Sequence, residues 1–330
     1  MTFAKKALIF GTLAAIGAGA TASATAQNTI NGAGATFPAP FYQRAFADAA
    51  RQGVQVNYQS VGSGAGVRQF LAGTVDFGAT DEPLKASEYS KGAAGKRGVV
   101  QFPAVGGTIA VAFNKADCKN LRLTQKQVAD IFLGNITRWD QLKCGKGKLS
   151  VAHRSDGSGT TFAFTNSLSA FSSEWKSKVG EGKSVKWPVG VGGKGNEGVA
   201  GVIQNTPGAI GYLNQAFVRG NIKAAAVQNK DGKFVMPTLR GGAAALNNIR
   251  LDANLAGEDP NPAGADSYPI STLTWILAYK DGNGPKAGSI RKAMLFLLGR
   301  GQNVADELGY VPLKGSILKQ AKAAVAKIGA

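Results

Sequence analysis

The sequence predicts an α/β fold with mainly parallel sheets. Short runs rich in Val, Ile and aromatic residues alternate with runs that have the period of an amphipathic helix. The chain has 330 residues, which is enough for two domains of ordinary size. The predicted strands are 55–60 (QVNYQS), 108–114 (TIAVAFN), 149–153 (LSVAH), 209–213 (AIGYL) and 272–279 (TLTWILAY). The predicted helices are 39–52, 66–73, 124–134, 161–171, 196–206 and 289–299.

The C-terminal quarter contains one irregular segment and one further helix. Residues 240–267 are rich in Gly, Pro and Asn, and we expect them to form a surface loop. The segment 316–328 predicts an amphipathic helix that packs on the core and turns its lysines outward. Its apolar face consists of Ile317, Leu318, Ala321, Ala324, Val325 and Ile328.

The N-terminus has the pattern of a secretory signal peptide. Lys5 and Lys6 precede an apolar run over 7–20, which is followed by small residues ending at Ala26. The apolar run has 14 residues, fewer than the roughly 20 that cross a bilayer. Cleavage fits after Ala24 or after Ala26, and we take residues 1–26 as the signal peptide. The predicted product is a soluble periplasmic protein.

Two cysteines remain beyond the signal region, Cys118 and Cys144. In an oxidising compartment, an even number of cysteines favours a disulfide over two free buried thiols. A metal site is disfavoured, since the single histidine, His153, has no cysteine near it in the sequence. We therefore predict a structural Cys118–Cys144 bond and no bound metal.

The formal net charge is +18, which is compatible with nucleic acid, a membrane surface or a small anionic ligand as partner. The lysines and arginines are scattered, and no block of five or six like charges occurs. This distribution argues against nucleic acid. It leaves open a generally basic exported protein and a protein that steers anions.

Four glycine-rich turns carry hydroxyl or carboxylate side chains: 32–37 (GAGATF), 62–66 (GSGAG), 76–82 (DFGATDE) and 154–161 (RSDGSGTT). Three of them lead into predicted helices, whose free N-terminal N–H groups suit an oxyanion. Each turn also has a simpler explanation. Thr36, Ser63 and Ser158 could be ordinary helix caps, and Arg154 with Asp156 could be a surface ion pair.

Catalytic motifs are weak or incomplete. The Walker pattern fails at both Gly-Lys pairs, because Ser177 stands at the first glycine position of one and Gly195 follows the lysine of the other. Residues 190–195 match G-x-G-x-x-G, but no acidic residue between 197 and 231 is available for a ribose. A serine hydrolase would depend on His153, and no G-x-S-x-G surrounds Ser63 or Ser158. We predict no catalytic residue and no cofactor.

Six motifs together resemble the periplasmic phosphate-binding proteins that serve the Pst-type ABC phosphate importer. They are GAGATFPAPFY (32–42), NYQSVGSGAGVRQF (57–70), VDFGATDEPL (75–84), HRSDGSGTTFAFT (153–165), WPVGVGGKGNEGV (187–199) and PGAIGYL (207–213). The resemblance implies a type II periplasmic-binding-protein fold with two α/β lobes joined by two crossing segments. We expect lobe I to comprise 27–104 and 217–330, lobe II to comprise 105–216, and the crossings to lie near 102–106 and 212–217.

The resemblance also implies the ligand and its contacts. Phosphate is expected to bind Thr36, Phe37 (through its backbone N–H), Ser63 and Asp81 of lobe I, and Arg154, Ser158, Gly159 and Thr160 of lobe II. Asp156 matches the acid that orients the arginine. The implied partner is the membrane permease of an ABC transporter, and the chain is expected to be monomeric. The alternatives are a binder of another oxyanion and a phosphatase-type enzyme that uses the same pocket.

Overall fold

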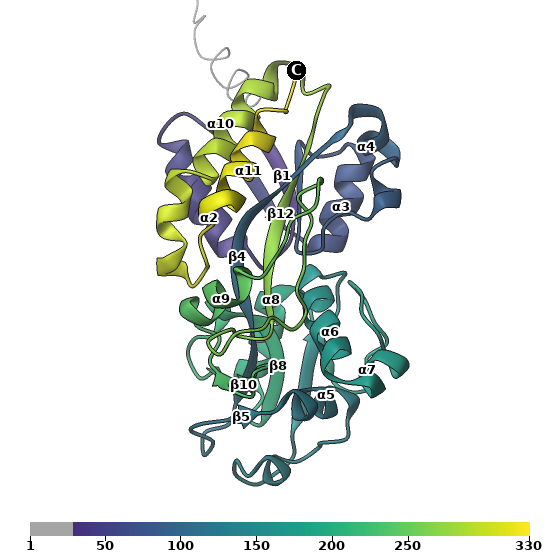
Figure 1. Ribbon diagram of the computed structural model, residues 1–330, viewed down its shortest axis with the longest axis vertical. Helices are drawn as coiled ribbons and strands as arrows, with labels where there is room; N and C mark the ends of the chain where they lie inside the picture. The colour runs from purple at the N-terminus through teal and green to yellow at the C-terminus, as the bar shows by residue number, and fades with distance from the viewer. Residues whose placement is uncertain (1–28) are drawn as a thin grey trace, which may run out of the picture.

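The computed structural model describes residues 29–330, which form two α/β lobes stacked end to end (Figure 1). Lobe I lies above and lobe II below in Figure 1, and two long strands run between them. The predicted signal peptide falls outside the described residues. Within residues 29–330, no helix is long and apolar enough to cross a membrane.

One sheet of nine strands passes through both lobes in the order β2-β1-β3-β12-β4-β8-β6-β7, with β9 beside β4. In lobe I, β1 pairs in parallel with β2 and β3; in lobe II, β6 pairs in parallel with β7 and β8. The connecting strands β12 and β4 are antiparallel to each other and to their outer neighbours. The bounds are β1 Ile30–Gly34, β2 Val56–Ser60, β3 Phe77–Thr80, β4 Val99–Asn114, β6 Ser150–Arg154, β7 Val191–Gly193, β8 Ala209–Asn214, β9 Lys223–Ala224 and β12 Ser271–Tyr279.

Strand β4 is a crossing segment. Residues 99–108 pair with β12, whereas residues 109–114 pair with β8, so one continuous strand belongs to both lobes. All of its residues except the first and last are buried. The first predicted crossing, 102–106, lies inside this strand.

The lobe boundaries remain a prediction, and the strand pairing favours a later return than residue 217. Strand β9 pairs with residues 112–113 of β4. A small second sheet then joins β5 (Arg122–Leu123), β10 (Ala226–Gln228) and β11 (Phe234–Val235). These pairings hold residues 223–235 against lobe II, because β9 pairs with β4, β10 pairs with β5, and β11 pairs with β10.

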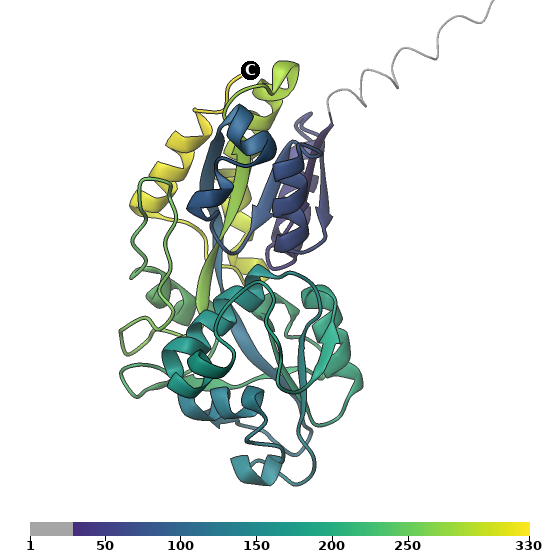
Figure 2. The ribbon, with the colours of Figure 1, turned by 90° about the vertical axis from the view of Figure 1, so that its right-hand side faces the viewer.

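Helices cover the sheet in both lobes (Figure 2). Lobe I carries α2 Ala39–Ala50, α3 Ser63–Ala72, α4 Gly92–Arg97, α10 Ala287–Leu297 and α11 Gly315–Val325. Lobe II carries α5 Gln125–Leu133, α6 Gly159–Phe171, α7 Ser173–Lys178 and α8 Gly195–Asn205. The predicted last helix is confirmed as α11, which buries Ala321, Ala324 and Val325.

The predicted loop over 240–267 is wrong at its start, where α9 spans Leu239–Leu246. Thr238 caps this helix by accepting a hydrogen bond from the Gly241 N–H. Two adjacent glycines disfavour a helix in isolation. They are tolerated here because a side chain at Gly242 would come within 2.8 Å of Val311, so close packing requires glycine.

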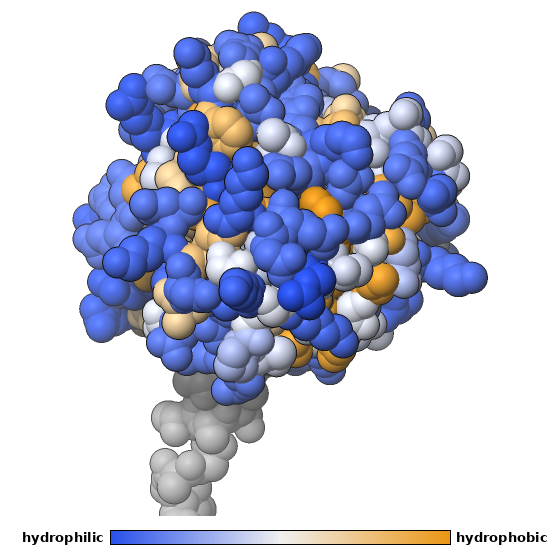
Figure 3. All heavy atoms as spheres, turned by 90° about the horizontal axis from the view of Figure 1, so that it is seen from below, coloured by the Kyte–Doolittle hydropathy of each residue, from blue (hydrophilic) through white to orange (hydrophobic). Residues whose placement is uncertain are grey.

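The predicted disulfide is confirmed: Cys118 and Cys144 are bonded, with their Cα atoms 5.0 Å apart. Both lie in lobe II. The free end of this lobe presents a largely hydrophilic face on which apolar residues are scattered (Figure 3).

Candidate anion-binding site between the lobes

Lobe I contributes three polar residues, which lie at one edge of its sheet. Thr36 comes after β1, Ser63 begins α3, and Asp81 comes directly after β3. Because parallel strands end at the same edge of a sheet, the fold brings these side chains together, as in other α/β sites. All three are almost completely buried. The Asp81 N–H donates to the Ser63 hydroxyl over 3.3 Å.

Lobe II contributes the end of β6 and the start of α6. Arg154 is the last residue of β6, and its guanidinium donates to both carboxylate oxygens of Asp156, at 2.8 and 2.6 Å. The arginine side chain is 1% exposed. Its Nη1 atom is buried and has no hydrogen-bond partner within residues 29–330.

Asp156 orients the arginine and is itself held in place. Its Oδ1 also accepts a hydrogen bond from the Gly195 N–H at the start of α8, over 3.0 Å. Burial works against its charge, but the hydrogen bonds and positive charge of Arg154 prevail and lower the pKa of Asp156. The carboxylate therefore stays ionised and keeps the guanidinium in one orientation.

Ser158 caps a helix, which was one of the two roles that the sequence analysis left open for it. Its hydroxyl accepts from the Thr161 N–H over 3.0 Å, so it is the N-cap of α6. The following residues, Gly159 and Thr160, form the first turn of this helix and face lobe I. A side chain at Gly159 would come within 2.7 Å of the Asp81 Cβ and the Ser63 hydroxyl, so only glycine permits this approach.

Hydrogen bonds across the cleft show that the lobes are closed. Thr160 donates to Asp81 Oδ2 over 3.1 Å. The Gly64 N–H donates to the Gly157 carbonyl over 2.8 Å. Phe37 is fully buried beside this contact layer, and its carbonyl accepts from Tyr310 over 2.7 Å.

Asn196 is a site residue that the sequence analysis missed. Its backbone N–H and its side-chain amide both donate to the Thr36 hydroxyl, at 3.0 and 2.8 Å. The same amide donates to Thr160 over 3.2 Å. The residue lies in the motif over 187–199, but nothing in the spacing distinguished it from the neighbouring turn residues.

Asp81 is bound on both of its oxygens. Thr274 of β12, a second residue that the sequence analysis missed, donates to Oδ1 over 2.8 Å, while Thr160 holds Oδ2. Burial raises the pKa of Asp81 to about 6, and the two threonine hydroxyls and the charges of Arg154 and Lys183 limit this rise. Asp81 is thus a carboxylate whose pKa lies well above the ordinary value for aspartate.

The rim of the cleft carries a further contact between the lobes. Lys183 of lobe II lies 2.6 Å from Glu82 Oε2 of lobe I, and Lys85 approaches the other oxygen at 3.4 Å. The Glu82 side chain is 4% exposed and that of Lys183 is 19% exposed. This ion pair is shielded from water far more than a typical surface pair.

The site offers anion-binding groups, and its one nearby histidine is packed against an aromatic ring. Among the described residues, no cluster of three His, Cys, Asp or Glu side chains could hold a metal ion. His153 points its ring at Trp187, with the two rings stacked at 4.9 Å, and its Nδ1 lies 3.0 Å from the Arg154 carbonyl. The histidine is therefore occupied in packing.

Comparisons with known proteins find similarity over most of the chain. A family model described as a PBP superfamily domain matches residues 19–298. The phosphate-binding protein PstS of Xylella fastidiosa (strain Temecula1) is 42% identical over 323 residues, covering 92% of this chain and 86% of the relative. The corresponding protein of Pasteurella multocida is 40% identical, with 91% and 90% covered. A phosphate-binding protein from Stenotrophomonas maltophilia has a similar fold, with a TM-score of 0.72, 20% identity, and 89% and 93% covered.

Proposed function

This chain belongs to the PstS family of phosphate-binding proteins in the PBP superfamily, and from that premise we propose that it captures inorganic phosphate in the periplasm for an ABC-type phosphate importer. The sequence-based bounds place lobe I at 27–104 with 217–330 and lobe II at 105–216, and we propose these two lobes with the return to lobe I shifted beyond residue 235, as the strand pairing favours. The permease, the monomeric state and export by cleavage after Ala24 or Ala26 are parts of the same proposal.

The observation that supports this function best is the buried arginine between the lobes. Arg154 carries a full positive charge, and its Nη1 donor is buried without a partner in the described chain. Buried donors without partners are rare in proteins, and they indicate a group that the donor serves in the working state. A tetrahedral oxyanion fits, because guanidinium forks and helix N-termini both favour such anions.

The proposed ligands come from both lobes. They are Thr36, Phe37 (backbone N–H), Ser63, Asp81, Arg154, Ser158, Gly159 and Thr160. Each donates a hydrogen bond to phosphate from an N–H or a hydroxyl group, except Asp81, which accepts one from phosphate. Since phosphate contacts both lobes only when they are closed, its binding favours the closed arrangement. A membrane permease can then distinguish the loaded protein from the empty one by shape.

The competing functions receive less support. Another oxyanion such as sulfate would place its acceptors against those of ionised Asp81. A phosphatase would need a base or a metal, and His153 is stacked on Trp187. We propose that the chain is not an enzyme.

Calorimetric titration of the purified protein, freed of phosphate by unfolding and refolding, tests the proposal. We expect saturable binding of one phosphate per chain and sulfate binding at least about 100-fold weaker. Hydrolysis of phosphate esters should remain at the background rate. Equal affinity for the two anions, or no phosphate binding by a folded sample, would overturn the proposal.

A further inference from the structure

Asn196, the second residue of α8, is completely buried between the two lobes and is not among the proposed phosphate ligands. Its backbone N–H and its side-chain amide donate to the Thr36 hydroxyl oxygen, at 3.0 and 2.8 Å. The same amide nitrogen donates to the Thr160 hydroxyl oxygen over 3.2 Å. Asn196 therefore contacts one proposed ligand from each lobe, and its hydrogen bonds to Thr36 cross the cleft.

The orientation of the Asn196 side chain is set by the sheet of lobe II. Its Oδ1 accepts a hydrogen bond from the Asn214 N–H over 2.8 Å. Asn214 is the last residue of β8 and pairs with Ile109 of β4, so the sheet holds this N–H in place. Because a backbone N–H only donates, the amide oxygen of Asn196 must face β8 and its NH2 group must face the two threonines.

The hydrogen bonds from Asn196 determine what the Thr36 hydroxyl can do. A threonine hydroxyl has one proton to donate and two lone pairs that accept. Asn196 uses both lone pairs of Thr36, and within residues 29–330 no acceptor takes the proton of this hydroxyl. Donation is therefore the one capacity that this buried hydroxyl has left. The ionised oxygens of an oxyanion only accept hydrogen bonds, so this is the direction that anion binding requires.

The start of α8 also positions two other groups of the site. Thr160 accepts from the Asn196 amide and donates its own proton to Asp81 Oδ2 over 3.1 Å. The preceding residue, Gly195, donates its N–H to Asp156 Oδ1, the carboxylate that orients the buried arginine. Two successive N–H groups of one helix thus hold groups that belong to both lobes.

We propose that Asn196 is a positioning residue of the anion site, which commits the Thr36 hydroxyl to donate to the bound oxyanion. This role rests on the proposed function, because it needs an anion in the cleft, but it holds for any oxyanion and not for phosphate alone. Without the Asn196 amide, the hydroxyl can turn and direct a lone pair at the anion. The site then loses a hydrogen bond and gains a repulsion between acceptors.

Two substitutions separate this role from packing. Asn196→Asp keeps the size and shape of the side chain, but at about pH 8.5 its carboxylate accepts the Thr36 proton and leaves a lone pair facing the anion. Asn196→Ala removes the amide and leaves the hydroxyl free to rotate. We expect calorimetry on phosphate-free protein to show a loss of phosphate affinity of about tenfold for Asn196→Ala and at least about 100-fold for Asn196→Asp. A packing role predicts the opposite order.

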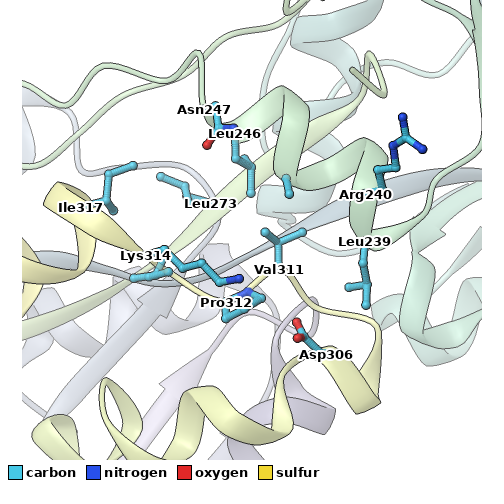
Figure 4. Close-up of a pocket in the computed structure, with 12 residues that line it drawn as sticks. Leu239, Arg240, Leu246, Asn247, Leu273, Asp306, Val311, Pro312, Lys314 and Ile317 are labelled. Atoms are coloured by element: carbon cyan, nitrogen blue, oxygen red, sulfur yellow. The ribbon is translucent and has the colours of Figure 1, made fainter. Parts of the chain in front are cut away.

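The control for the added negative charge is Asn247→Asp. Asn247 is exposed and lines a cavity of about 290 Å³ between α9 and the segment that leads into α11, outside the anion site (Figure 4). None of the residues that line this cavity is a proposed phosphate ligand. The phosphate affinity of Asn247→Asp should match that of the parent. A loss as large as that of Asn196→Asp would mean that net charge causes the effect, and would overturn the proposal.

A double-mutant cycle with Thr36→Val tests whether Asn196 acts through the Thr36 hydroxyl. Thr36→Val removes the hydroxyl and keeps a similar shape. In this background, Asn196→Ala should lower phosphate affinity less than about threefold, against about tenfold in the parent. Circular dichroism checks that each variant is folded, and Asn196→Ser takes the place of Asn196→Ala if the latter is not.

The same titrations are made with sulfate, so that the two proposals can fail separately. If the parent binds sulfate and not phosphate, the proposed function is wrong, and the variants are compared by their sulfate affinity. The positioning role is wrong if Asn196→Ala costs the same affinity in both backgrounds, or if Asn196→Asp costs less than Asn196→Ala. A folded parent that binds neither anion contradicts both proposals.

Discussion

Thr160 at the start of α6 donates a hydrogen bond to Asp81 across the cleft, over 3.1 Å, while Thr274 holds the other carboxylate oxygen from behind at 2.8 Å. Asp81 is therefore fixed by lobe I on one side and contacted by lobe II on the other. The first contact exists only while the lobes are closed. The closure of the lobes, the protonation of Asp81 and the choice of anion therefore all depend on this one carboxylate.

The raised pKa of Asp81 predicts a pH-dependent effect on stability. The folded value is about 6 and the ordinary value is 3.8, so the folded chain binds the extra proton between these two pH values. The unfolded chain binds fewer protons in that window, and the contribution of Asp81 to stability therefore falls as pH rises through it. Asp81→Asn has no ionisable group at this position, so its free energy of unfolding does not decrease in this way as pH rises. We expect the ligand-free variant to be more stable than the parent by about 1 to 3 kcal/mol at pH 7.5.

Urea unfolding of both proteins between pH 4 and pH 8 checks this. The difference in their free energy of unfolding should grow between pH 4 and pH 6 and stay level above it, because other carboxylates affect both proteins equally. A difference independent of pH would mean that Asp81 keeps an ordinary pKa.

Arg154→Ala should weaken phosphate binding by about 2 to 5 kcal/mol, because a desolvated anion loses a counter-charge that Asp156 had oriented. Arg138→Ala is the control, since Arg138 forms an exposed pair with Asp140 in the same lobe at 3.0 Å. Its affinity should match the parent. A loss below tenfold in Arg154→Ala, about 1.4 kcal/mol, would show that backbone amides and hydroxyls suffice.

The ion pair between Lys183 and Glu82 links the two lobes and should stabilise the closed state. Lys183→Met removes the charge that lobe II places 2.6 Å from Glu82 and keeps much of the apolar side chain. We expect phosphate affinity to fall about tenfold, mainly through faster dissociation. Lys178→Met is the matched control, because Lys178 pairs with Glu174 inside lobe II. If stopped-flow measurements show that phosphate dissociates equally fast from the parent and from Lys183→Met, the ion pair does not stabilise the closed state.

Much of this architecture could be predicted from sequence, because most helices and several strands have a clear local pattern. The exceptions depend on tertiary contacts. Strand β1 has the sequence INGAG, with low strand propensity, and forms because β2 and β3 pair with it on both sides. Helix α9 contains Gly241 and Gly242 and forms because close packing against Val311 requires small residues.

The site shows the same division. The glycine-rich turns could be found in the sequence, but not their convergence, which depends on how the lobes close. Thr274 was hidden because β12 is buried on both faces, so alternation along the strand gives no sign of its role. Lys183 lies in an irregular segment, and only the closed fold places it beside Glu82.

The disulfide should stabilise the fold because it restricts the conformations of the unfolded chain. Cys118 and Cys144 are 26 residues apart, and closing a loop of that length contributes about 3 to 4 kcal/mol in the chain-entropy model. The double variant Cys118→Ala/Cys144→Ala should lose about that much free energy of unfolding in urea. Phosphate affinity should stay within about twofold of the parent. Equal stability of the two proteins would indicate that the loop is already ordered in the unfolded state.

Asp81 should also decide which oxyanion binds, through repulsion as much as attraction. Both common phosphate ions near neutral pH keep at least one P–OH, whereas sulfate keeps none. An ionised carboxylate only accepts hydrogen bonds, so Asp81 can receive the phosphate proton and can offer sulfate nothing. Sulfate would leave acceptors facing each other in a buried site, with like charges nearby.

In Asp81→Asn, the charge is removed and the side-chain amide can donate, so the repulsion of sulfate disappears. Sites that require one hydrogen bond discriminate by about 10⁴ to 10⁵, whereas size alone cannot separate two similar tetrahedra. We expect the ratio of phosphate to sulfate affinity to fall at least about tenfold in this variant, while phosphate affinity itself changes little. Titration of both anions into the parent, the variant and Asp140→Asn as an exposed control measures the ratio. If the Asp81→Asn protein rejects sulfate as strongly as the parent does, selectivity comes from another group.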